Sequence, residues 1–226
     1  MYEGIDGIRV IFEGINFQRL MVGLLVTLKI AAVSVAVSIP VGVLFGILMT
    51  SRKKWVRLLC YFYLDAIRII PILVLLFVFY FEITRVFKIQ WSGEFVAIIV
   101  FSMWGIAEMG DLTRGAIRSL PKHQIESALA LGLSENAIHR HIIIPQITRR
   151  LIPPSINLIT RMIKTTPLVA LISVIEILKV GQQIIEYNLY RNSTASFWIY
   201  GFIFIVYFLL CYPIAEVSRR LEKRWG

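Results

Sequence analysis

The sequence has 226 residues, of which 58% are hydrophobic and 17% are charged, and its mean hydropathy is +0.74. A soluble domain rarely reaches that hydropathy, so we expect an integral membrane protein whose long apolar segments decide its class. The formal net charge of +10 would suit nucleic-acid binding, but the basic residues gather in three short clusters. We interpret these clusters as signals of membrane topology and expect no nucleic-acid partner.

The first segment, MYEGIDGIRVIFEGINF, is acidic and lacks a basic region before an apolar core, so we expect no removable signal peptide. Five apolar segments predict five transmembrane helices, at residues 20–49, 58–83, 94–115, 150–178 and 195–217. A hydrocarbon core of about 30 Å takes roughly 20 helical residues, and the uncharged stretches 30–50 and 195–215 are each long enough. The predicted fold is therefore an all-α integral membrane domain covering residues 1–226, with a polar loop at 121–146.

The distribution of charge predicts how this domain is oriented. The three basic clusters are Arg52, Lys53, Lys54 and Arg57; His139–His141 with Arg149 and Arg150; and the tail RRLEKR at 219–224. With five spans, all three clusters fall on one side, and the other side carries the mixed charges of Glu3, Asp6, Glu13, Glu82, Lys88, Glu94 and Glu186. The positive-inside rule then puts the N-terminus outside, and the C-terminus and the polar loop in the cytoplasm.

The first three predicted spans contain residues that need an explanation inside a bilayer. Gly42 and Gly46 form a G-x-x-x-G pattern, which predicts close helix packing. Asp65 and Arg68 are three residues apart on one helix face, so they either neutralise each other or place Arg68 at a gate or a subunit interface. Glu108 and Asp111 have the same spacing, and we expect them to form structural ion pairs with nearby arginines, which are Arg114 and Arg118.

The polar loop predicts two short helices joined by a sharp bend. Residues 122–131 are rich in Ala, Leu, Glu and Gln, which favour helix, and Gly132 suits a helix C-terminal stop. Ser134 can cap a second helix from Glu135 to about His141, and Pro145 restricts the turn that follows. We expect this pair of helices at the membrane surface.

The residues of this loop suit docking better than catalysis. His139 and His141 are two residues apart and diverge on a helix, so we expect no metal site there. The sequence has no arrangement typical of a Ser-His-Asp or Cys-His nucleophile, so we expect no catalytic residues and no enzyme activity. A GxxxxGK(S/T) phosphate loop is also missing from the sequence, so ATP should not bind this chain through that motif.

The fourth predicted span carries a polar segment before a proline. Arg161 and Lys164 lie on one helix face, and Thr165, Thr166 and Pro167 follow. Because Pro167 has no N–H to donate, we expect a kink and a backbone carbonyl without its helical partner. Broken helices near the midplane often form binding sites in transporters, so we predict that Lys164, Thr165 and Thr166 line a path, where a cation would suit a carboxylate. The alternative is a kink that only shapes a subunit interface.

The loop also carries a family resemblance. Glu126-Ser127-Ala128, three residues, Gly132, nine residues, Ile142, one residue and Ile144-Pro145 resemble the EAA signature of importer-type ABC permeases, which reads E-A-A, three, G, nine, I-x-L-P. Every spacing matches, with Ser127 and Ile144 as mild replacements. In that family this region is the coupling helix, which sits in a cleft of a separate ATPase subunit. The residues that the resemblance assigns to ATPase coupling are Glu126, Ser127, Ala128, Gly132, Leu133, Ser134 and Pro145.

The resemblance extends over nearly the whole chain. The segments IRIIPILVLLFVFYF at 67–81 and AEMGDLTRGAIRSLPKHQIESALALGLS at 107–134 resemble permeases for polar amino acids of the histidine, arginine and glutamine type. Two sites depart from that pattern: Ile69-Ile70 stand where Gly-Thr is usual, and Thr165 and Pro167 stand where Asp and Ser are common. These departures lie in segments that the resemblance places near the substrate. The resemblance therefore leaves open which amino acid is carried.

The resemblance implies a fold like that of type I ABC importers, in the cytoplasmic (inner) membrane of a bacterium. It implies three kinds of partner: a dimer of cytoplasmic P-loop ATPases that hold the ATP and Mg, a second permease copy or paralogue, and an extracytoplasmic substrate-binding protein. The chain itself would hold no cofactor and would move its substrate by alternating access. The residues of the expected substrate path are Arg68, Glu108, Arg161, Lys164, Thr165 and Thr166.

Three alternatives stay open. One is a secondary transporter that couples ions through Glu108, Asp111 or Asp65. Another is a membrane scaffold or sensor in which the loop only docks a protein, and the last is an ABC permease for a solute other than an amino acid. Neither a secondary transporter nor a scaffold or sensor explains the signature of the loop.

Overall fold

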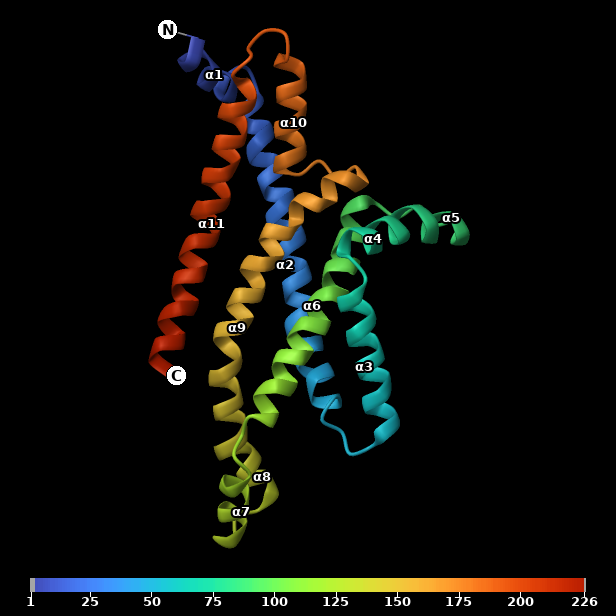
Figure 1. Cartoon of the computed structure of the whole chain (residues 1–226), viewed down its shortest axis with the longest axis vertical. Coiled ribbons are helices and arrows are strands. Elements are labelled where there is room, and N and C mark those ends of the chain that lie inside the picture. Colours follow the sequence, from blue (N-terminus) through green and yellow to red (C-terminus); the bar gives the residue numbers. More distant parts are fainter. Residues whose placement is uncertain (1–2, 226) are drawn as a thin grey trace. The chain divides into compact units, whose positions relative to one another are not determined.

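The computed structural model describes residues 3–225, apart from the side chains of residues 3–6, 122 and 139. Within that range the regular secondary structure is helical and contains no strand, which confirms the all-α prediction (Figure 1). The helices of the first half are α1 (Glu3–Phe12), α2 (Asn16–Leu48), α3 (Lys54–Ile69), α4 (Ile72–Phe77), η1 (Val78–Ile83), α5 (Thr84–Phe87) and α6 (Gly93–Arg118). Those of the second half are α7 (Lys122–Ala130), α8 (Glu135–Ile138), η2 (His139–Ile143), α9 (Ile144–Thr165), η3 (Thr166–Ile172), α10 (Ile177–Asn188) and α11 (Ala195–Trp225).

The chain divides into two compact units. Unit 1 comprises residues 1–34, 72–101 and 160–213, and unit 2 comprises residues 35–71, 102–159 and 214–226. The long helices α2, α6, α9 and α11 each contribute residues to both units.

Three helices of the described chain, α2, α6 and α11, are each long and apolar enough to cross a membrane. They correspond to the first, third and fifth predicted spans. Two helix pairs separated by short breaks, Lys54–Ile69 with Ile72–Phe87 and Glu135–Ile172 with Ile177–Asn188, raise the count to five if each pair forms one broken span. The second and fourth spans, predicted as single helices, are therefore interrupted, and five crossings remain a prediction.

The first interruption follows from a proline. Helix α3 ends at Ile69, and Ile70 has the extended backbone angles φ −78° and ψ 124° immediately before Pro71. The proline ring disfavours helical angles in the residue before it, so the helix stops and α4 begins at Ile72.

The second interruption lies around Pro167 and is longer than the expected kink. The α-helical hydrogen bonding of α9 gives way at Thr165 to the 3₁₀ turns of η3, and Ser173 then adopts the left-handed conformation at φ +65°. The hydroxyl of Thr166 donates to the carbonyl of Ile163 at 2.7 Å, so that carbonyl has a partner in place of the missing proline N–H. Helix α10, which starts anew at Ile177, was not predicted as a separate element.

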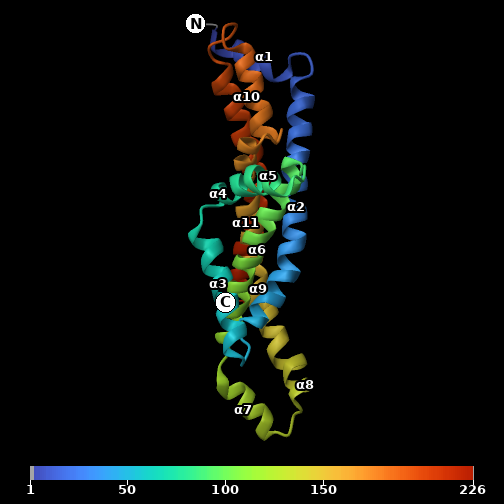
Figure 2. The ribbon, with the colours of Figure 1, turned by 90° about the vertical axis from the view of Figure 1, so that its right-hand side faces the viewer.

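The core of unit 1 joins α1, α2, α10 and α11. Val10 and Ile11 of α1 are buried together with Leu20 of α2 and with residues of α10 and α11, and Figure 2 shows α1 lying across the end of this group. At Gly23, an added Cβ would lie 2.9 Å from the Cα of Ile177. The glycine therefore lets α2 and the start of α10 approach backbone to backbone.

The core of unit 2 joins α2, α6 and α9. An added Cβ at Gly42 would lie 2.5 Å from the Cβ of Met109, and one at Gly46 would lie 2.5 Å from the carbonyl oxygen of Gly110. This confirms that the G-x-x-x-G pattern serves close helix packing. Met109 is fully buried and packs in one apolar cluster with Leu151 and Leu158 of α9.

Candidate functional site

The polar loop folds as two short helices, as predicted. Helix α7 ends at Ala130, one residue before the predicted limit, and α8 covers only Glu135–Ile138 before five residues of π-helix lead into α9. Within unit 2, α7 and α8 lie together where α6 ends and α9 begins (Figure 1). Pro145 is the second residue of α9 and directly follows the π-helical residues His139–Ile143, to which it has no N–H to donate.

The bend between the two helices depends on Gly132. Its φ is +80°, a left-handed angle that glycine adopts without steric cost. The N–H of Gly132 donates to the carbonyl of Leu129 at 2.9 Å, and that of Leu133 donates to the carbonyl of Ala128 at 3.1 Å, which closes the C-terminus of α7. The hydroxyl of Ser134 accepts from the N–H of Ala137 at 3.3 Å, which confirms its predicted role as the cap of α8.

The loop presents apolar side chains outward. Ala128 and Ile138 are buried between the two helices, but Leu129, Leu131 and Leu133 are exposed, Leu131 by 81%. Glu126, Ser127 and Pro145, which the signature assigns to coupling, are also exposed. A group of exposed leucines with polar neighbours is typical of a surface that binds another protein.

Two hydrogen bonds tie the ends of the loop to each other. The Gln146 amide nitrogen donates to the side-chain oxygen of Gln124 at 2.8 Å. An Arg150 Nη1–H donates to the carbonyl of Ser119 at 2.9 Å, which links α9 to the residue after α6. The loop is therefore held as one body on two helices.

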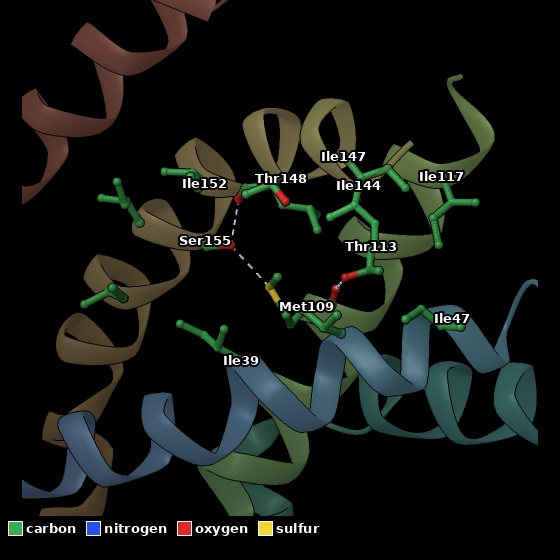
Figure 3. Close-up of a pocket in the computed structure, with 14 residues that line it drawn as sticks. Ile39, Ile47, Met109, Thr113, Ile117, Ile144, Ile147, Thr148, Ile152 and Ser155 are labelled. Carbon is green, nitrogen blue, oxygen red and sulfur yellow. Dashed lines mark hydrogen bonds between the residues drawn. The ribbon is translucent and has the colours of Figure 1, made fainter. Parts of the chain in front are cut away.

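A groove of about 570 Å³ lies in unit 2 beside the loop (Figure 3). Its walls are aliphatic side chains of α2, α6 and α9, and Ile144, the first residue of α9, contributes to one end. The Thr113 hydroxyl donates to the carbonyl of Met109 at 2.8 Å, and the Ser155 hydroxyl donates to that of Leu151 at 2.6 Å. With no charged side chain in its walls, the groove does not suit an amino-acid zwitterion.

The charged residues of α3 and α6 form one cluster in unit 2, which we call the charged cluster. Arg68 contacts Glu108, Nε to Oε1, at 3.3 Å, and Asp111, Nη2 to Oδ2, at 2.8 Å. Arg114 donates from Nε to Asp111 at 2.9 Å and lies over the ring of Tyr61, 5.8 Å from its centroid.

This geometry excludes one of the two interpretations of Arg68. Among the described side chains, Arg68 pairs with the carboxylates of α6 and not with Asp65. The interpretation that Asp65 and Arg68 neutralise each other was therefore wrong. The predicted pairing of Asp111 with Arg114 is confirmed. The side chains of Arg68, Asp111 and Arg114 remain 39%, 21% and 22% exposed, so the cluster is open on one side.

The other predicted path residues belong to unit 1 and differ in accessibility. Arg161 and Lys164 are exposed, and the hydroxyl of Thr165 donates back to the carbonyl of Arg161 at 2.8 Å. Thr166 is fully buried, and its hydroxyl also lies 3.3 Å from that of Tyr207. The placement of Thr166 on a path therefore needs correction, because its side chain belongs to the core of unit 1.

Sequence reasoning missed Glu176. This carboxylate is fully buried at the break before α10, where it accepts the N–H of Lys179 at 2.8 Å and lies 3.4 Å from the hydroxyl of Thr27. It caps α10 and forms, with Thr27, Thr166 and Tyr207, a polar group inside an apolar core. The signal in the sequence is a single acid in the apolar run LISVIEILKV.

Comparison with known proteins gives consistent results. Residues 38–225 match the family described as binding-protein-dependent transport system inner membrane component. The chain is 30% identical over 215 residues to the probable amino-acid ABC transporter permease protein YckA of Bacillus subtilis (strain 168), covering 93% of this chain and 91% of that protein. It is 32% identical over 163 residues to the glutamine transport system permease protein GlnP of Escherichia coli (strain K12), covering 72% of each.

Solved structures show the same fold. A chain in the crystal structure of an amino acid ABC transporter with histidines matches with a TM-score of 0.82 at 24% identity, covering 92% of this chain and 94% of that one. A chain of the MetNI methionine ABC transporter in an inward-facing conformation matches with a TM-score of 0.69 at 19% identity, covering 93% and 97%. The predicted resemblance of the fold to ABC importer permeases is confirmed.

Proposed function

This chain belongs to the family of binding-protein-dependent transport system inner membrane components, and we propose that it forms part of the membrane path of an ATP-driven importer for polar amino acids. It is a transport subunit, and in such systems the ATPase activity lies on separate chains. The amino-acid substrate is proposed from the names of the relatives together with the charged cluster. A zwitterion needs both a cation and an anion to bind it, and Arg68 with Glu108 provides both signs.

The distribution of charge over the two units supports the proposed orientation. All three basic clusters, around Arg52, Arg149 and Arg220, belong to unit 2, and Glu82, Lys88, Glu94 and Glu186 belong to unit 1. Under the positive-inside rule, the loop and the C-terminus, which both belong to unit 2, would face the cytoplasm.

The coupling loop is where a cytoplasmic ATPase would dock. The exposed Leu129, Leu131 and Leu133 offer the apolar contact, and Glu126 offers a charge at its edge. Because the loop is held as one body by Gln124–Gln146 and Arg150–Ser119, movement of the ATPase would shift α6 and α9 together. Alternating access of the path would follow from that shift, with a second permease chain completing the path and a binding protein delivering the substrate.

Each unit, taken by itself, holds charged residues that suit a substrate path. In unit 2 these are Arg68 and Glu108, which contact each other. In unit 1, Lys164 and Arg161 are exposed, and a cation there would suit a substrate carboxylate. Glu108 and Asp111 both contact Arg68, so both acids are engaged in ion pairs.

The test is binding of the P-loop ATPase encoded with this chain, both purified from one co-expression. We expect the ATPase to remain bound to the native chain and to be lost with Leu131→Asp or Gly132→Asp, because each puts a charge on the apolar docking surface. The matched control is Gly14→Asp, since Gly14 also has a positive φ, +56°, and free space around an added Cβ but belongs to unit 1. If the native chain binds no ATPase, or if Gly14→Asp releases it equally, the proposal fails.

A further inference from the structure

Helix α3 carries an exposed apolar stripe along its length. Its members are Trp55, Leu58, Leu59, Phe62 and Ile69, which are exposed by 60 to 79%. Their spacing of three, four and seven residues places them on one helix face. The opposite face, with Cys60, Leu64 and Ile67, is buried in unit 2.

A carboxylate interrupts this stripe at its edge. Asp65 is exposed, one turn from both Phe62 and Ile69 and next to the side that holds Arg68. From Lys54, the first residue of α3, to Asp65 the helix rises about 16 Å at about 1.5 Å per residue. That rise is roughly half of a hydrocarbon core of about 30 Å, so Asp65 would lie near the middle of the bilayer.

Lipid cannot cover this side of the molecule at a reasonable cost. A charged group at the bilayer centre is expensive unless protein or water surrounds it, and the adjacent charged cluster is open as well, with Arg68 exposed by 39%. Helix α11 provides the contrast: Phe197, Phe204 and Leu209 are exposed by 63 to 72%, and residues 195–215 contain no charge. That surface suits lipid, and the surface of α3 does not.

We propose that the α3 stripe is the surface on which the second permease chain packs, so that the charged cluster lies beside the contact and is closed off from lipid by that chain. The inference rests on the proposed function, which requires a second chain, and adds which surface it covers. Without that chain the path is incomplete, because the open side of Arg68, Asp111 and Asp65 would meet the bilayer. An apolar stripe bordered by charges matches the pattern of an interface with an apolar centre and a polar rim.

Photo-crosslinking in native membranes tests this assignment. The photoreactive residue p-benzoylphenylalanine replaces Phe62 in the complete transporter, and in a matched control it replaces Phe204, which has nearly the same exposure, 71% against 74%. We expect the Phe62 probe to give a covalent adduct of two permease chains, about twice 26.0 kDa for two copies of this chain. We expect none from the Phe204 probe. Both positions are exposed, so the variants should fold, and size-exclusion chromatography checks that they do.

Retention of the ATPase, measured on the same preparations, separates the two proposals. If the ATPase is retained but Phe62 gives only lipid adducts, or if the permease adduct forms from Phe204 instead, the assignment of this surface is wrong and the proposed function stands. If neither the ATPase nor a permease adduct is found, both are wrong.

Discussion

Replacing Gly46 by alanine tests whether α2 and α6 pack as tightly as the structure shows. An alanine Cβ there would lie 2.5 Å from the carbonyl oxygen of Gly110, and ordinary contact begins at 3.4 Å. The difference, 3.4 minus 2.5, means that the two helices must separate by about 0.9 Å. The Cβ of Thr113 would also lie 2.4 Å from the added Cβ. Neither a carbonyl oxygen nor a Cβ atom moves when a side chain rotates, so rotation cannot relieve the overlap.

The expected magnitude follows from two opposing terms. Overpacking a well-packed site costs about 1–3 kcal/mol, and alanine gains up to about 1 kcal/mol over glycine inside a helix. Gly201→Ala in α11 isolates the second term, because no heavy atom lies within 4 Å of its added Cβ. The propensity gain cancels between the two variants, so Gly46→Ala should be less stable than Gly201→Ala by about 1–3 kcal/mol.

Thermal unfolding of the two variants in the same detergent, followed by size-exclusion chromatography of the folded fraction, measures this difference. For a chain of this length, 1 kcal/mol shifts the midpoint by roughly 2–4 °C. If Gly46→Ala unfolds at the same temperature as Gly201→Ala, or at a higher one, the close approach of α2 and α6 at Gly46 is wrong.

Three further predictions concern the polar residues. Arg68→Met should leave ATPase binding unchanged and lower substrate uptake roughly tenfold or more, since hydrogen bonds to charged groups contribute about 1.5–3 kcal/mol. Uptake is measured in proteoliposomes, and an unchanged rate would show that Arg68 is not part of the path. Lys164→Gln should raise the KM of uptake more than it lowers the maximal rate, and equal kinetics for both proteins would argue against a role in binding the carboxylate. Thr166→Val should destabilise the protein by about 1–3 kcal/mol, because it leaves the carbonyl of Ile163 without the hydroxyl donor. A melting temperature equal to that of the control Thr165→Val would contradict this.

Local chemistry in the sequence predicted the coupling loop well. Gly132 and Ser134 act on backbone groups only a few residues away, so the bend and the cap could be inferred from residue type alone. The break at Ile70 has the same origin, since the ring of Pro71 acts on its direct neighbour. The predicted span 58–83 ran through this break as one helix, because the apolar residues on both sides of Pro71 hide where a helix stops.

Contacts between distant segments were not predictable in this way. Asp65 is three residues from Arg68, whereas Glu108 and Asp111 are about forty away, and only the packing of α3 on α6 decides which carboxylate Arg68 contacts. The sequence placed Thr166 beside Lys164 and Thr165 on a path. In the structure Thr166 begins the 3₁₀ helix η3, and its side chain is buried in the core. Glu176 escaped notice because Thr27, whose hydroxyl its carboxylate contacts, lies 149 residues away in the sequence.

The aliphatic groove of Figure 3 has a mechanical consequence for the proposed importer. The loop is stiff, because hydrogen bonds clasp its two ends, and the charged cluster locks α3 to α6 through ion pairs. In contrast, α2 faces α9 across the groove through methyl groups of residues such as Ile39, Ile147 and Ile152, and such apolar surfaces can slide past each other. Movement of the rigid loop would therefore be taken up at the groove, where α9 would slip past α2 while the ion pairs hold.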